Sequence, residues 1–306
     1  MYLRVSVTDR CNLRCTYCLP EDARFALSRA APAELDQLMA AVVAAAGVRK
    51  IRITGGEPTL APTLIQHVQA AAWLVPTVGL TTNGLLLENL LPELIGAGLN
   101  RLNISLDAAE AQGFLRATRR DRFPAVVAGL RAAKRAGMTP LKINAVATVD
   151  TDPVALVRFA LAEGVHLRFI ELMDIGEAHA TWGERHVPAA VLQGRLADAG
   201  IHLSEAPERD DPTSRVWTMA GADPAVTTVG FITTVSEPFC ATCDRLRLTS
   251  QGRLHTCLFD AQGTDLLTPL RAGDLAGLAA TIRRAVASKA PPPTFQRVAV
   301  MAGIGG

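Results

Sequence analysis

The chain has 306 residues, 49% of them hydrophobic, so it is long enough for one large domain or two smaller ones with a full core. Its 31 basic and 29 acidic residues leave a net charge of +2, which argues against a general nucleic-acid binder and restricts any anion site to a local cluster. No run approaches the roughly 18 apolar residues of a membrane span, and the first residues lack a signal-peptide pattern. We therefore expect a cytoplasmic protein with reduced thiols and no membrane partner.

Six short runs rich in Ile, Val, Leu and Thr are typical of strands and lie at residues 3–8, 50–54, 77–81, 101–106, 141–148 and 166–173. Helical patterns separate them at 32–46, 62–73, 86–95, 124–136 and 153–162. Helix C-terminal caps are expected at Gly47, Gly96, Gly137 and Gly164. This alternation predicts an α/β fold with parallel strands. Six units are too few to close an eight-unit TIM barrel, so we expect a partial, open β/α barrel with function at the carboxyl ends of its strands.

The regular alternation of strand and helix patterns ends at about residue 187. A helical pattern at 188–199 is followed by a proline-bearing loop at 207–212 and by strand-like runs at 226–235 and 245–249. The run at 253–258 follows a turn and predicts the returning strand of a hairpin. A helix is expected at 274–287 and a rigid spacer at 291–293. We therefore expect two domains, 1–186 as the partial barrel and 187–306 as an α+β extension over its open side.

Cys11, Cys15 and Cys18 form a CxxxCxxC pattern directly after the first predicted strand. Three thiolates on one loop suit a soft metal centre, and they are one ligand short of closing a four-iron cluster. A zinc site with a missing ligand and three unrelated buried cysteines are the alternatives, although closed zinc sites normally show four ligands. The spacing favours an iron–sulfur cluster with one open iron.

A second set consists of Cys240, Cys243 and Cys257, spaced as CxxC and then thirteen residues. It again supplies three ligands, and a structural zinc site completed by His255 is its main alternative. The two sets use all 6 cysteines of the chain. That count favours two open clusters.

Basic residues accompany both sets. Arg4, Arg52 and Lys142 stand within predicted strands, and Arg245 and Arg247 follow the second set closely. A charged side chain inside a barrel is costly unless it is paired. If these side chains point inward, they form a cavity suited to a triphosphate, which Arg binds in bidentate fashion. The alternative is that each of them lies on the solvent side of its strand.

Several segments together resemble one known family. They are LRVSVTDRCNLRCTYC, KIRITGGEPTL, LTTNG, LNISLD, RFIELMD, GFITTVSEPFCATCDRLRLT, GRLHTCLF and the terminal Gly-Gly. The match is to the GTP 3′,8-cyclases, the molybdenum cofactor biosynthesis protein A (MoaA) family of radical S-adenosylmethionine (SAM) enzymes. It runs over nearly the whole chain and includes the spacing of both cysteine sets. It implies the radical SAM type of partial barrel and two 4Fe-4S clusters, one on each set.

The resemblance also implies a reaction. SAM is cleaved to methionine and a 5′-deoxyadenosyl radical, which takes the 3′ hydrogen of GTP. The C3′ radical then attacks C8 of guanine, and reduction gives (8S)-3′,8-cyclo-7,8-dihydroguanosine 5′-triphosphate, the first intermediate of molybdenum cofactor biosynthesis. The implied partners are GTP, an electron donor and the downstream cyclic pyranopterin monophosphate synthase, with a homodimer as one option.

Site residues carry over by position. SAM contacts are implied for Tyr17, Gly56, Ser105 and Met173. The implied GTP contacts are Arg4, Arg52, Thr81, Lys142, Arg245, Leu246 and Arg247, of which Leu246 offers only backbone or packing. Arg4 is a candidate for assisting the final reduction, and the Gly305-Gly306 tail resembles one that threads toward the active site.

Two departures leave details open. Asp244 replaces an Asn common in the family, and residues 175–186 lack the usual glycine-rich pattern. Two alternatives to the cyclase remain, a different radical SAM enzyme with an auxiliary cluster and a non-catalytic zinc-bearing nucleotide-binding protein.

Overall fold

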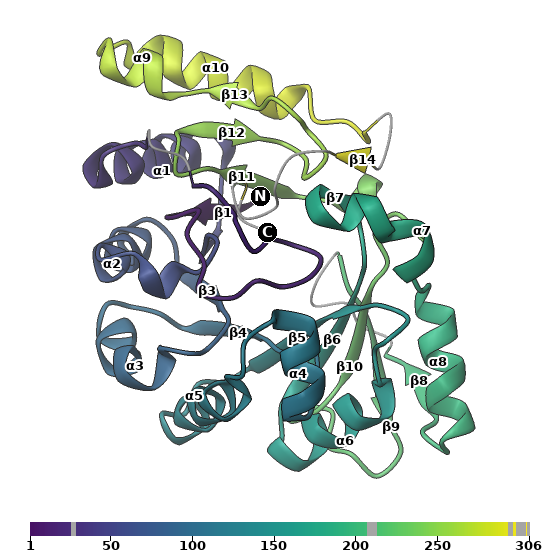
Figure 1. Cartoon of the computed structure of the whole chain (residues 1–306). Helices are drawn as coiled ribbons and strands as arrows, with labels where there is room; N and C mark the ends of the chain where they lie inside the picture. The colour runs from purple at the N-terminus through teal and green to yellow at the C-terminus, as the bar shows by residue number, and fades with distance from the viewer. Residues whose placement is uncertain (26–28, 207–212, 293–295, 298–303, 305–306) are drawn as a thin grey trace.

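The protein is described by a computed structural model that covers residues 1–25, 29–206, 213–292, 296–297 and 304. Its centre is a row of six parallel strands that pair in chain order (Figure 1). They are β1 (Tyr2–Ser6), β2 (Lys50–Thr54), β3 (Thr77–Thr82), β4 (Arg101–Ser105), β5 (Leu141–Ala147) and β6 (His166–Glu171). The row is open rather than closed, which confirms the predicted partial barrel.

Helices follow the strands and cover the outer face of the sheet (Figure 1). They are α1 (Pro32–Ala46), α2 (Leu64–Leu74), α3 (Leu87–Gly96), α4 (Ala111–Thr118), α5 (Phe123–Arg135) and α6 (Pro153–Glu163). Successive strand side chains point to opposite faces of a sheet. Leu3 and Val5 of β1 are therefore buried in the outer core, whereas Tyr2 and Arg4 face the barrel interior.

Two local expectations need correction. The helix α4 was not predicted, because its eight residues contain Gly113 and follow a polar stretch without a clear apolar period. The predicted cap Gly96 is instead the last residue of α3, and the left-handed residue is Gly98, with a φ of 103°. The caps predicted at Gly47, Gly137 and Gly164 do have positive φ angles, of 63°, 72° and 62°.

The C-terminal region adds strands to both edges of the same sheet. The strands β10 (Val229–Ile232), β9 (Arg215–Met219) and β8 (Leu203–Glu205) continue outward from β6. On the other side, β11 (Arg245–Leu248), β12 (Arg253–His255) and β13 (Thr264–Asp265) continue outward from β1. The antiparallel pairing of β11 with β12 confirms the predicted hairpin.

The remaining elements are short or lie outside the sheet. They are η1 (Pro58–Leu60), β7 (Asp174–Ile175), η2 (Gly176–Thr181), α7 (Trp182–Arg185), α8 (Ala189–Asp198), η3 (Cys240–Thr242), α9 (Leu267–Arg271), α10 (Leu275–Ala287) and β14 (Gln296–Arg297). Among the helices in the described part of the chain, none is both long and apolar enough to cross a membrane.

The directions of β1, β11 and β12 determine at which end of the strands each cysteine set lies. The first set follows β1, whereas Cys240 and Cys243 precede β11, which runs parallel to β1. Cys257 follows the returning strand β12, so it lies at the same end as Cys240 and Cys243. The two sets therefore lie at opposite ends of strands about 15 Å long, at roughly 3.3 Å per residue.

The N-cap of α6 offers a test of the fold. The Asp152 side chain accepts a hydrogen bond from Ala155 N at 3.0 Å. We expect Asp152→Ala to lower the free energy of unfolding by about 1 kcal/mol, the usual effect of losing such a cap. Urea unfolding followed by circular dichroism checks this. The control is Glu110→Ala at the N-cap of α4, where the side chain makes no capping bond. Equal losses in both variants would contradict the capping account.

Candidate active site

A cavity of about 2060 Å³, open mouth included, runs through the inside of the partial barrel. All six cysteines line it, namely Cys11, Cys15, Cys18, Cys240, Cys243 and Cys257. The two sets thus share one chamber, although they are far apart in the sequence.

The first cysteine loop packs tightly on the segment after β2. Gly56 N donates to Thr8 O at 2.7 Å, and Glu57 N donates to Arg10 O at 2.7 Å. A Cβ at Gly56 would lie 2.5 Å from both Asp9 O and Arg10 O, so only glycine fits there. Gly56 is therefore needed to bring the strand end against the cysteine loop, and it lines the cavity.

Glu57 joins the ends of β2 and β3. It is 1% exposed, and its carboxylate accepts bonds from Thr59 N at 3.0 Å, Thr82 Oγ1 at 2.7 Å and Asn83 N at 2.7 Å. Burial raises the pKa of Glu57, while these hydrogen bonds oppose the rise. The segment KIRITGGEPTL contains Glu57, but no local pattern indicated which groups its carboxylate would bind.

Tyr17 fixes the cysteine loop to the next strands. Its hydroxyl donates to Asp107 Oδ2 at 2.8 Å, and Asp107 Oδ1 accepts from Val146 N at 2.8 Å. Burial raises the pKa of Asp107 to about 6 against the effect of these two bonds. Ser105 and Met173 also line the cavity. All four residues implied for SAM binding therefore border one space, together with the unpredicted Asp107.

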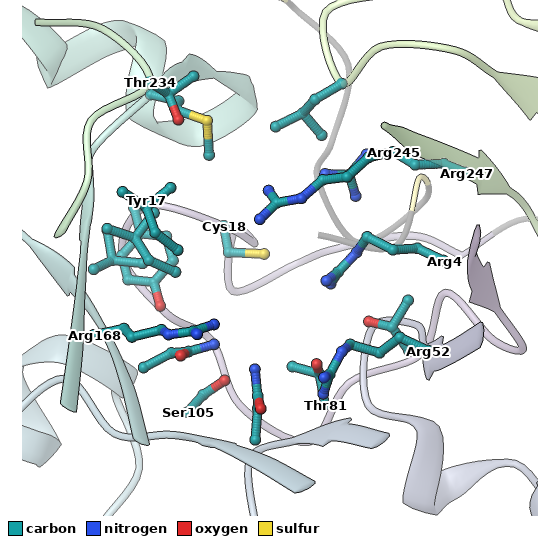
Figure 2. Close-up of a pocket in the computed structure, with 18 of the residues that line it drawn as sticks. Arg4, Tyr17, Cys18, Arg52, Thr81, Ser105, Arg168, Thr234, Arg245 and Arg247 are labelled. Carbon is teal, nitrogen blue, oxygen red and sulfur yellow. The ribbon is translucent and has the colours of Figure 1, made fainter. Parts of the chain in front are cut away.

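The basic residues are neighbours across three parallel strands. Arg4 on β1 is in register with Arg52 on β2 and with Arg247 on β11. Figure 2 shows these three guanidinium groups and that of Arg245 extending into the space beside Cys18. Each of them lines the cavity, so the inward orientation is the one that the structure shows.

A glycine on β3 makes room for Arg52. Gly79 is in register with Arg52, and a Cβ there would lie 2.9 Å from Arg52 Cζ. The guanidinium can therefore lie over β3, where Nη1 donates to Leu80 O at 3.0 Å. Thr81 follows on the same strand, and its buried Oγ1 has no hydrogen-bond partner among the described residues.

The electrostatics of this cluster favour an anion. Burial lowers the pKa of Arg247 well below its ordinary value, and the charges of Arg4 and Arg245 lower it further. The pKa of Arg4 is also lowered, first by burial. The buried Nε of Arg245 lacks a partner within the described chain. A polyanion would neutralise the crowded charges and satisfy these open polar atoms.

Arg168 is a cavity residue that the sequence interpretation missed. It lies on β6, is 8% exposed, and points into the cavity from the side opposite Arg4 (Figure 2). A Cβ at Gly230 on β10 would lie 3.2 Å from Arg168 Cγ, so a small residue there accommodates its stem. Arg168 could have been found by the same criterion as Arg52, because each is a charged residue within a strand-like run.

Other implied residues lie elsewhere. Lys142 is half-buried on β5 and is in register with Asn103. Of these two residues, Asn103 lines the cavity and Lys142 does not. Leu246 is fully buried in the outer core. The Asp244 carbonyl accepts from Tyr2 N at 3.1 Å. Gly305 and Gly306 lie outside the described residues.

The segment 175–186 contacts the first cysteine loop. It forms β7, η2 and α7. Arg185 Nη1 donates to Thr16 Oγ1 at 3.0 Å, and Trp182 Nε1 donates to Leu172 O at 2.9 Å. This segment supports the loop from outside.

The thiols fit cluster ligands. Burial raises the pKa of Cys15 well above its usual value, with Asp107, Cys18 and Cys11 adding to the effect, so the first three thiols are close neighbours. Likewise burial raises the pKa of Cys240, helped by Cys257 and Cys243. Within the described chain, no three Cys, His, Asp or Glu side chains are arranged to hold a single metal ion. In a four-iron cluster each cysteine binds a different iron, so the thiols need not converge on one point.

Comparisons with known proteins agree with this geometry. Residues 5–151 match the radical SAM superfamily, and residues 165–295 match the family described as Molybdenum Cofactor Synthesis C. The structure of Streptococcus suis SuiB bound to S-adenosylmethionine has the same fold, with a TM-score of 0.59 over 92% of this chain and 67% of that chain at 16% identity. Fold and site thus define a radical SAM enzyme.

The sequence relatives are more specific. The chain is 42% identical to a GTP 3′,8-cyclase of Mycolicibacterium smegmatis, over 99% of this chain and 89% of the relative. It is 41% identical to a GTP 3′,8-cyclase of Heliobacterium modesticaldum, over 94% of this chain and 90% of the relative. The chain belongs to the GTP 3′,8-cyclase family.

The carboxylate of Glu57 can be tested directly. Glu57→Gln replaces one acceptor oxygen by an NH₂ group that faces the donors of Thr59, Thr82 or Asn83. A buried donor without an acceptor costs about 1–3 kcal/mol, so we expect the free energy of unfolding to fall by about that amount. Urea unfolding followed by circular dichroism measures this. Exposed Glu88→Gln is the control, and an equal free energy of unfolding in both variants would contradict the role of Glu57 in joining the ends of β2 and β3.

Proposed function

We propose that this chain is a GTP 3′,8-cyclase, which converts GTP to (8S)-3′,8-cyclo-7,8-dihydroguanosine 5′-triphosphate in the first step of molybdenum cofactor biosynthesis. SAM is consumed and yields 5′-deoxyadenosine and methionine. The observation that supports this most strongly is a cluster of buried and half-buried arginines in one cavity between two sets of three cysteines. Membership of the cyclase family supports the same conclusion.

Each cysteine set is proposed to hold one 4Fe-4S cluster. Cys11, Cys15 and Cys18 would hold the first, and Cys240, Cys243 and Cys257 the second. With SAM bound, the first cluster supplies a carbon radical, and the open iron of the second supplies a ligand position for guanine. Leu13 N donates to Cys11 Sγ and Phe259 N to Cys257 Sγ, both at 3.5 Å, and such bonds tune sulfur ligands.

SAM is proposed to bind at the carboxyl ends of the strands. Tyr17, Gly56, Ser105 and Met173 all border the cavity there. Gly56 lets the cysteine loop pack against the end of β2, which brings that loop to the same space. The bond from Tyr17 to Asp107 keeps the loop between Cys15 and Cys18 in one position.

The triphosphate of GTP is proposed to bind deeper in the barrel, along the arginines. Arg4, Arg52 and Arg247 present adjacent guanidinium groups from three strands, and Arg168 faces them. Thr81 and Arg245 contribute the open polar atoms. Lys142 and Leu246 complete the implied set, Lys142 from beside the cavity and Leu246 through its backbone.

The main contribution of the protein is positioning. A carbon radical abstracts hydrogen from almost any neighbour, so the site must hold the 3′ hydrogen nearest and exclude water. Bidentate arginines anchor the triphosphate and thereby fix the ribose. Arg4 would also hold positive charge beside the base during the final reduction, and Gly305 and Gly306 would approach the site.

The proposal includes further partners. A one-electron donor must reduce the first cluster, and cyclic pyranopterin monophosphate synthase would take the product. We propose a cytoplasmic location and keep a homodimer as a hypothesis for sedimentation analysis.

The reaction is tested by isotope transfer. In an anaerobic assay with SAM and GTP deuterated at C3′, we expect the deuterium to appear in 5′-deoxyadenosine. Mass spectrometry of the nucleoside measures this, with GTP deuterated at C8 as the control. Unlabelled 5′-deoxyadenosine, or its formation without GTP, would reject the cyclase.

Iron content tests the two cluster sites. The reconstituted protein is expected to hold about eight irons, and the single substitutions Cys15→Ala and Cys257→Ala should each reduce this to about four, since each set holds one four-iron cluster. Cys257→Ala should retain SAM binding, whereas Cys15→Ala should lose it. Loss of SAM binding from Cys257→Ala alone would contradict the assignment.

Arg168 tests the extent of the triphosphate site. Removing one charge-assisted bond costs about 1.5–3 kcal/mol, so Arg168→Gln should raise the KM for GTP by roughly 10- to 100-fold. The affinity for SAM should change little. Exposed Arg158→Gln on α6 is the control. A KM for GTP equal to that of the wild type would exclude Arg168 from the site.

A further inference from the structure

Tyr2 lies inside the basic cluster, and none of the proposed SAM or GTP contacts involves it. Its hydroxyl oxygen accepts a hydrogen bond from Arg52 Nε at 2.7 Å. Lys50 Nζ lies 5.0 Å from the centre of its ring. Tyr2 is in register with Lys50 on one side and with Arg245 on the other, and it lines the cavity.

The charges that face Tyr2 are positive on every neighbouring strand. Arg4 lies on its own strand, Lys50 and Arg52 on β2, and Arg245 and Arg247 on β11. Burial raises the pKa of Tyr2, but the charges of Arg52, Arg4, Arg245 and Lys50 outweigh it and lower the pKa to about 7. The phenol is therefore close to half-ionised at neutral pH.

The carboxylates that line the same cavity accept hydrogen bonds from groups outside the arginine cluster. Glu57 accepts bonds at the end of β3, and Asp107 binds Tyr17. Glu171 accepts from Val235 N and Ser236 N, both at 2.9 Å. Tyr2, by contrast, accepts a hydrogen bond from the arginine cluster itself.

We propose that Tyr2 is a positioning residue that holds Arg52 in the nucleotide-free site and takes up a proton when the triphosphate binds. The inference rests on the proposed function, because it requires a triphosphate at the arginines. As a phenolate, Tyr2 partly balances the crowded positive charge. An incoming triphosphate takes over that balance, so the phenolate oxygen is protonated from solvent, and no electrons are exchanged.

Proton uptake predicts a definite sign for the pH dependence. Below pH 7 Tyr2 is already protonated, and binding costs no proton. Above pH 7 Tyr2 must gain a proton when the triphosphate binds. The affinity for the triphosphate therefore falls by up to about tenfold per pH unit, until the pH reaches the pKa of Tyr2 in the bound state. Tyr2→Phe keeps the ring beneath Lys50 but removes this requirement. Its affinity at low pH should be weaker, because Arg52 Nε loses its acceptor, and its pH slope should be shallower.

Calorimetry of the reconstituted holoenzyme tests this. Binding of GTP, and of inorganic tripolyphosphate, is measured from pH 6.5 to 8.5 in two buffers of different ionisation enthalpy. At pH 8 we expect roughly one proton to be taken up by the wild type and far fewer by Tyr2→Phe. Trp73→Phe, at an exposed side chain on α2 outside the site, is the control and should retain the uptake.

The outcomes separate the inference from the function. If GTP binds and Tyr2→Phe takes up as many protons as the wild type, the inference is wrong while the cyclase stands. If neither GTP nor tripolyphosphate binds to any form, the proposed function fails.

If Tyr2→Phe does not fold, the wild type labelled with ¹³C at the tyrosine Cζ atoms gives the answer. The Tyr2 signal should titrate near pH 7, because its hydroxyl lies among the basic side chains. GTP should shift that midpoint upward. An unchanged midpoint would overturn the proposal.

Discussion

The structure depends on positive charge held side by side inside a barrel. Arg52, Arg4 and Arg247 come from three adjacent parallel strands and occupy one level of the sheet. Burying such charges without a counter-ion is expensive. The cost is understandable if a polyanion completes the site, and Tyr2 supplies part of the balance before it arrives. The glycines at 79 and 230 leave space for the long side chains on either side.

The same strand geometry explains why two distant cysteine sets share a chamber. The strand β11 enters the sheet beside β1 and runs parallel to it, so residues before β11 and residues after β1 lie at opposite ends of one interior. The arginines lie between these ends. We propose that a nucleotide held there reaches toward both sets, which is the arrangement needed if a radical is generated at one end and a base is bound at the other.

Much of the fold followed from local patterns. The six strands and the β11–β12 hairpin were predicted by apolar runs and turn residues, and both cysteine sets were found by their spacing. The position of β11 beside β1 was not predictable in this way, because pairing between residues about 240 positions apart leaves no local signal. For the same reason the sequence could not show which side chains share the cavity.

The residues that were missed illustrate this limit. Arg168, Tyr2 and Asp107 each look like an ordinary member of a strand or its end, and only register and strand twist bring them to the site. Conversely, Lys142 carries the same sequence signal as Arg52 but lies beside the cavity rather than among its lining residues. Lys142 shares a face of β5 with Asn144 and Val146, which do line the cavity, so its place along the strand rather than its direction keeps it out of the lining.

The central claim is that two open clusters in one cavity bind two different ligands, SAM at one cluster and the guanine of GTP at the other. Electron–nuclear double resonance of the reduced protein, loaded with SAM labelled with ¹³C at its carboxylate and GTP labelled with ¹⁵N in guanine, tests it directly. The account predicts that ¹³C couples to the cluster on Cys11, Cys15 and Cys18, and that ¹⁵N couples to the cluster on Cys240, Cys243 and Cys257. Coupling of both labels to the same cluster, or absence of the ¹⁵N coupling with GTP bound, would contradict it.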